Sequence, residues 1–179
     1  MKISESVSLR KLQQDAEDNF RNGYFCCEAL MAAVRDNFDL DISNDVIKMS
    51  SGMAVGVGKS GCICGALNGG VLALGLFFGR SEQSGPGDPK VVKCLELTNE
   101  LHDWFKVANG KNTNCCRILT REFDMKQGEH KEQCIYFTGL AAWKVGEIVC
   151  RELGVENTDV KNNIPSLDEE LREVFEARR

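Results

Sequence analysis

The chain has 179 residues, 42% of them hydrophobic, and its 27 acidic side chains outnumber its 22 basic ones to give a net charge of −5. This length suits one domain with a small appendage, and we predict a helical domain over 1–155 and a C-terminal helical extension over 156–179. No basic surface favours nucleic acid, and the longest apolar run, about 65–79, is shorter than the roughly 20 residues that span a bilayer.

The N-terminal part of the chain shows helical periodicity interrupted by turn residues. Residues 5–21 are predicted to form an amphipathic helix, which Asn22-Gly23 ends. Apolar residues at helical spacing predict a second helix over about 24–38. Ser43 is suited to cap a third helix over about 44–55.

A glycine-rich loop over 56–61 leads into a strongly apolar helix, predicted over about 63–79. Glycines inside this helix each lower helix propensity by up to about 1 kcal/mol. Such residues indicate either tight packing between helices or the close approach of a prosthetic group.

The next helix is predicted to begin at Asp88-Pro89, because aspartate caps helices and proline is favoured in the first turn. Gly110 ends it, and Thr113 or Asn114 is suited to cap a short helix that reaches about residue 122.

A long helix is predicted over about 132–153, before Gly154, and a capping box at Ser166–Glu169 predicts a final short one. Alternating strand patterns are rare in this sequence. The expected fold is therefore all-α, a bundle of about six to eight helices.

Nine cysteines set this chain apart from an ordinary helical protein. The first residues lack a secretory signal pattern, so we expect a cytoplasmic protein, where structural disulfides are rare. An odd number of cysteines also cannot pair completely within one chain. The thiols are therefore expected to be free, metal-bound or redox-cycling.

Four of the cysteine-bearing regions lie at or just before predicted helix starts. Helix N-termini carry free N–H groups and the positive end of the helix dipole, and both stabilise thiolates. If these regions converge, several thiolates share one site. The cysteines in question are Cys26/Cys27, Cys62/Cys64, Cys115/Cys116 and Cys134.

The remaining candidates have simpler interpretations. Cys94 lies on the apolar stripe of its helix and is predicted to be a core residue. Cys150 is too far along its helix from Cys134 to share a site with it. His130, four residues before Cys134, could join a metal site, but a surface histidine is the favoured interpretation.

The segment Cys64-Gly65-Ala66-Leu67-Asn68-Gly69 resembles the central motif of the redox-active protein family labelled C_GCAxxG_C_C. The resemblance covers about residues 20–150. It implies one cysteine before the motif, matched by Cys26, and two after it, matched by Cys116 and Cys134. It also implies a redox role. The family is similar to split-Soret cytochromes, and of their cofactors only the iron–sulfur centre could apply to this chain.

The leading hypothesis is an electron-transfer protein in which Cys26, Cys64, Cys116 and Cys134 bind an iron–sulfur cluster, [2Fe–2S] being favoured. Two alternatives stay open: a metal-free thiol–disulfide oxidoreductase, and a structural zinc module. The redox partner is unknown. The glycine-bearing helix and the tryptophans make a homodimer an additional expectation.

Overall fold

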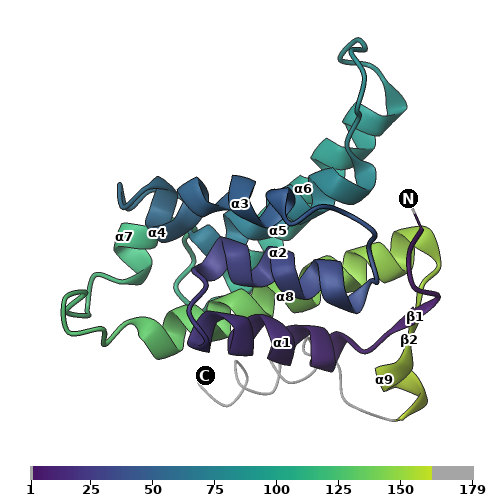
Figure 1. Cartoon of the computed structure of the whole chain (residues 1–179). Helices are drawn as coiled ribbons and strands as arrows, with labels where there is room; N and C mark the ends of the chain where they lie inside the picture. Colours follow the sequence, from purple (N-terminus) through teal and green to yellow (C-terminus); the bar gives the residue numbers. More distant parts are fainter. Residues whose placement is uncertain (1, 163–179) are drawn as a thin grey trace.

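The computed structural model describes residues 2–162, and within them nearly all of the regular secondary structure is helical. The predicted all-α class is confirmed (Figure 1). The elements in chain order are β1 (Ser6–Val7), α1 (Leu9–Arg21), α2 (Cys26–Asn37), α3 (Asp45–Ser50), η1 (Ser51–Met53), α4 (Ala54–Val57), α5 (Gly65–Phe78), α6 (Pro89–Ala108), α7 (Cys116–Leu119), α8 (Lys131–Leu153), β2 (Glu156–Asn157) and α9 (Thr158–Lys161). The capping box at Ser166–Glu169 lies outside the described residues.

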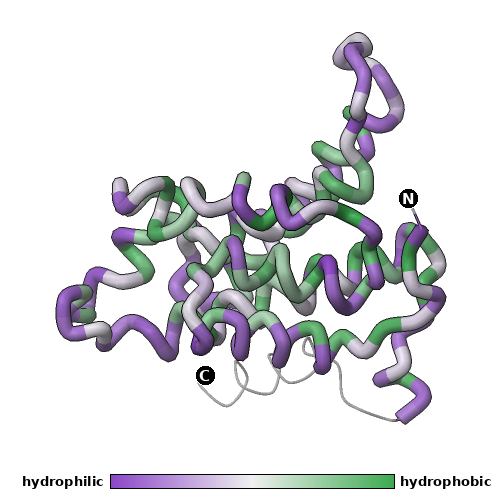
Figure 2. The backbone as a smooth tube through the Cα atoms, in the orientation of Figure 1, coloured by the Kyte–Doolittle hydropathy of each residue, from purple (hydrophilic) through white to green (hydrophobic). Residues whose placement is uncertain are grey.

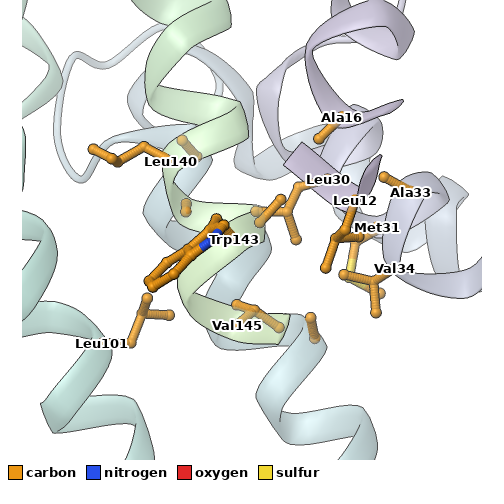
Figure 3. Close-up of a cluster of buried hydrophobic side chains, with 14 of the residues drawn as sticks. Leu12, Ala16, Leu30, Met31, Ala33, Val34, Leu101, Leu140, Trp143 and Val145 are labelled. Carbon is orange, nitrogen blue, oxygen red and sulfur yellow. The ribbon is translucent and has the colours of Figure 1, made fainter. Parts of the chain in front are cut away.

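The core lies between α1, α2, α5 and α8. Figure 3 shows Leu12 of α1 facing Leu30 of α2, with Val145 of α8 close by, and all three side chains are fully buried. Burying a leucine or valine side chain contributes about 1.5–3 kcal/mol. Gly146 brings α8 close to α1, because a Cβ there would lie 2.6 Å from Leu12 Cδ2.

The N-terminal segment differs from the predicted helix over 5–21. Ser6 and Val7 form β1, which pairs in parallel with Glu156 and Asn157 of β2, and α1 begins only after Ser8. The Ser8 side chain accepts a hydrogen bond from Lys11 N and so caps α1. A strand of two residues whose partner lies about 150 positions away in sequence has no local sequence pattern from which it could be predicted.

Asp159 of α9 anchors the C-terminal part of the described chain to α1. Its carboxylate accepts hydrogen bonds from Ser8 Oγ at 2.6 Å and from Arg10 N at 2.9 Å, and the residue is only 4% exposed. Changing Asp159 to alanine is expected to lower the free energy of unfolding by about 1–3 kcal/mol, because buried donors lose their acceptor. Urea denaturation measures this loss, and an unchanged midpoint would contradict it.

The first half of α6 projects from the body of the molecule together with the loop before it (Figure 1). Figure 2 shows that this loop is mostly hydrophilic. The core prediction for Cys94 is therefore wrong: Cys94 is only partly buried, and its neighbour Leu95 is 64% exposed. The buried stripe of α6 begins later, at Leu97 and Leu101.

The two tryptophans connect α6 to α8. Trp104 and Trp143 stack with ring centroids 6.0 Å apart, and Trp143 is buried. Aromatic pairs of this kind contribute about 0.5–1.5 kcal/mol beyond the area that they bury. Within residues 2–162, every helix is too short or too polar to cross a bilayer.

Candidate functional site

A cavity of about 400 Å³ opens where several helices begin, and Cys26, Cys64, Cys116 and Cys134 all line it. Two of these cysteines are the first residues of α2 and α7, one is the N-cap of α5, and one lies in the first turns of α8. Figure 1 shows α4, α7 and the start of α8 together at one end of the molecule. The fold thus brings together four cysteines from four separate segments.

The walls of this cavity change from buried to exposed. At most 8% of each of Cys26, Cys64 and Cys116 is accessible, whereas Tyr24 and Phe25, which also line the cavity, are 43% and 49% exposed. These three cysteines therefore lie at the inner end, and Tyr24 and Phe25 lie nearer to solvent.

Two glycines of the central motif give α2 and its first cysteines the room that they occupy. A Cβ on Gly65 would lie 2.1 Å from Cys26 Sγ, and a Cβ on Gly69 would lie 2.9 Å from Cys27 Cα. Real Cβ atoms do not approach other atoms so closely. These two glycines are therefore explained by close contact with α2 and, at Gly65, by the sulfur itself.

A short antiparallel bridge joins the segments that carry Cys64 and Cys116. Ile63 pairs with Cys115, Cys64 N donates to Asn114 O at 2.8 Å, and Cys116 N donates to Cys62 O at 2.5 Å. These backbone bonds hold the two cysteines beside each other although they are far apart in sequence.

The helix predicted over 44–55 ends early, and the chain then turns left-handed. After α3 and η1, the five residues 55–59 all have positive φ, including Val55 at 52° and Val57 at 64°. A β-branched residue in this region is strained. The turn lies against the site, since a Cβ on Gly56 would approach Cys116 Cβ to 2.8 Å. Strained backbone held against functional side chains is typical of binding and catalytic sites.

A family model described as "Putative redox-active protein (C_GCAxxG_C_C)" matches residues 24–148, which is more than half of the chain. The chain belongs to the C_GCAxxG_C_C family. No curated protein and no solved structure matches it significantly. The matched region contains all four cysteines of the cavity and the start of each helix that carries or follows them.

Among the four cavity cysteines of this C_GCAxxG_C_C protein, Cys26 ionises first. Its pKa falls from the ordinary 9.0 to about 7, mainly because the Cys27 thiol donates a hydrogen bond to it and because the N–H groups of Val55 and Cys27 lie near its sulfur. The Cys27 S–H also faces Ser50 O at 2.9 Å. The single Cys27 S–H proton can bond to only one of these acceptors at a time. We assign this hydrogen bond to the Ser50 carbonyl oxygen when Cys26 is a thiol. When Cys26 is ionised, we assign it to the Cys26 thiolate, which is the stronger acceptor.

Alkylation with iodoacetamide tests this assignment on metal-free protein. Because a lowered pKa means that the thiolate is already half-formed near pH 7, the rate for Cys26 is expected to rise with pH and to reach half its maximum near pH 7. The variant Cys26→Ser should lack this phase. A midpoint at pH 8.5 or above, the range of an ordinary thiol, would contradict the assignment.

The other cavity cysteines are thiols at neutral pH in the metal-free protein. Burial raises the pKa of Cys64 and of Cys116, and raises that of Cys134 to about 12. The nearby Cys26 thiolate adds to the rise at all three. The Cys26 thiolate thus acts electrostatically on each of the other three cavity cysteines. A bound cation would reverse the effect and release their protons.

His130 is a residue of the cavity that sequence reasoning placed on the surface. It precedes α8 as its N-cap and lines the cavity. Its Nδ1 atom is buried without a hydrogen-bond partner among the described residues, and burial lowers its pKa. The i, i+4 spacing to Cys134 was the available signal. An unsatisfied buried nitrogen is uncommon in a native protein and indicates a partner that belongs there.

All nine cysteines lie within the described residues and all are free. Across residues 2–162, no three histidine, cysteine or acidic side chains are placed to hold one metal ion together. The cysteines therefore share a cavity without forming a compact site for a single ion.

Proposed function

We propose that this redox-family protein is an electron-transfer protein in which Cys26, Cys64, Cys116 and Cys134 bind an iron–sulfur cluster, [2Fe–2S] being favoured. The observation that carries the proposal is the shared cavity: four cysteines from four helix starts line it. Four thiolates are the usual complement of such a cluster.

The surroundings of the sulfurs suit anionic ligands. Backbone N–H groups of Ala66 and Leu67 lie near the sulfur of Cys64, and that of Val55 lies near Cys26. N–H groups directed at thiolates stabilise them and tune the potential of a bound cluster. When bound, the cluster would supply one-electron exchange, and the protein would hold it through the four sulfurs.

A single zinc ion fits this arrangement less well. Zinc binds sulfur at about 2.3 Å in a tetrahedron, so its ligand sulfurs must lie within roughly 4 Å of one another. No three suitable side chains in the described part of the chain meet that demand. In a cluster, different irons take different thiolates, so the sulfurs lie further apart.

Purification without oxygen tests the proposal. The protein should be brown, show sulfur-to-iron charge-transfer absorption, and contain iron and acid-labile sulfide in equal amounts, about two of each per chain for [2Fe–2S]. Protein that stays colourless and iron-free after reconstitution with iron and sulfide would rule the cluster out. Stoichiometric zinc in its place would select the zinc alternative.

A second candidate function is metal-free thiol–disulfide exchange. It is favoured by the lowered pKa of Cys26 beside the protonated Cys27, since a thiolate next to a thiol is the reactive arrangement for exchange. In such exchange two thiols of this chain are oxidised to one disulfide, and a disulfide of the substrate protein takes up the two electrons and two protons and becomes two thiols. Intact mass spectrometry of oxidised and reduced protein should then differ by about 2 Da per bridge, and the absence of any reversible bridge would exclude this function.

Three further expectations stay predictions. These are a cytoplasmic location, a separate protein as redox partner, and a homodimer. Sedimentation of the purified protein measures the last directly.

A further inference from the structure

Two neighbouring segments beside the cavity carry positive charge in an otherwise acidic chain. Residues 46–64 and 113–121, here called the basic face, contain Lys48, Lys59, Arg117 and Arg121 and no aspartate or glutamate. The chain as a whole has a net charge of −5. These segments are therefore positively charged although the whole chain has a net negative charge.

The segments of the basic face lie side by side in the fold. Arg117 N donates to Gly61 O at 3.0 Å, and Arg117 Nη2 donates to Ser60 O at 2.7 Å. Figure 1 shows α4 next to α7. Within residues 2–162, none of the four cations of this face forms an ion pair, and all four are exposed. Their charges are thus available to a partner.

Exposed apolar side chains accompany these charges. Met49 is 78% exposed, and Met53, Val57, Ile63 and Ile118 are 37–45% exposed. Large apolar side chains mixed with arginine are typical of protein–protein interfaces rather than of ordinary surface.

The basic face also gives access to the cysteine site. A second cavity of about 210 Å³ lies between Lys59 and Arg117 and reaches Cys116. Cys116 lines the first cavity too, together with Val55 and Thr120. A protein bound on this face would therefore lie over a cavity that Cys116 lines.

We propose that the basic face docks the acidic surface of a separate electron-transfer protein. The inference rests on the proposed function for the identity of the partner, and on charge complementarity for its chemistry. Complementary charge steers association and aligns partners, and the apolar side chains supply the contact area. A second copy of this chain, or a nucleic acid, would be a different occupant of the same surface.

The experiment uses an acidic plant-type [2Fe–2S] ferredoxin as the probe, and calorimetry or fluorescence anisotropy at low and at 0.5 M salt. We expect micromolar binding that weakens at least tenfold at high salt, because such attraction is screened. The double variant Lys59→Glu, Arg121→Glu should weaken binding at low salt at least tenfold. The control Lys2→Glu, Lys90→Glu makes the same change in net charge far from this face and should alter binding less than threefold.

Three results would overturn the inference. The first is no ferredoxin binding at low salt, or equal weakening by the two double variants. The second is tighter binding of a 20-base-pair DNA duplex than of ferredoxin, lost in the Lys59/Arg121 variant. The third is a dimer of the unmodified protein that this variant dissociates in sedimentation, which would make a second copy the occupant.

Failure of this inference is distinguishable from failure of the proposed function. The variants retain every cysteine, and binding is measured alongside the iron content of each sample. Iron-loaded protein that does not bind ferredoxin contradicts only the docking surface. Protein that binds ferredoxin through the basic face but takes up no iron contradicts only the cluster.

Discussion

Alanine at Gly65 is expected to remove cofactor binding while every cysteine is retained. The added Cβ would lie 2.1 Å from Cys26 Sγ. The least costly relief is rotation of the short Cys26 side chain, which carries its sulfur away from the present position. Iron per chain should fall below a tenth of the unmodified value, and overpacking should lower the free energy of unfolding by about 1–3 kcal/mol.

Gly75 provides a matched control in the same helix. A Cβ at Gly75 meets no atom within 4 Å, so Gly75→Ala should retain full iron content. It should stabilise the protein by about 0.5–1 kcal/mol, because alanine favours a helix interior over glycine. Iron content and urea denaturation are measured on both variants. Full iron loading of Gly65→Ala, or equal loss from both, would contradict the role of Gly65.

Serine at Cys64 is expected to abolish cofactor binding with little effect on the fold. Cys64 is the N-cap of α5, and serine is among the best N-cap residues. Stability should therefore change by less than about 1 kcal/mol, whereas the chain loses one of the four proposed thiolate ligands. Iron and sulfide after anaerobic reconstitution should drop at least fivefold.

Cys94→Ser is the control for this change. Cys94 lies on α6, is only partly buried, and does not line the cavity. Its substitution should leave iron, sulfide and the absorption spectrum unchanged. If Cys64→Ser retains full iron loading, or if Cys94→Ser loses as much, the four cavity cysteines are not the ligands.

Much of the helical framework could be predicted from local sequence signals. The apolar helix expected over 63–79 is α5, and Asp88-Pro89 does begin α6, with Asp88 as its cap. The helix expected over 132–153 is α8, which ends at Gly154 in a left-handed conformation. These boundaries rest on caps, glycine and proline, which act within a few residues of themselves.

The left-handed turn over 55–59 could not be predicted in this way. Valine strongly disfavours positive φ, so the valines at 55 and 57 do not predict a left-handed turn. Their conformation depends on neighbours that are distant in sequence, since Cys62 N donates to Gly56 O and Gly56 packs on Cys116. Tertiary contacts of this kind override local preference.

The surroundings of the cysteines also could not be predicted from the sequence. The low pKa of Cys26 depends on the Cys27 thiol and on N–H groups supplied from two segments. The buried Nδ1 of His130 depends on how the start of α8 meets the cavity. Spacing along the chain selects candidate residues, whereas their protonation depends on burial and neighbours that only the fold sets.

The most direct test of the central claim is anomalous diffraction at the iron absorption edge, from crystals grown without oxygen. We predict anomalous density for two irons inside the cavity, with the sulfurs of Cys26, Cys64, Cys116 and Cys134 each within bonding distance of one of them. A peak bound by other residues, or none in crystals of protein reconstituted with iron and sulfide, would contradict it.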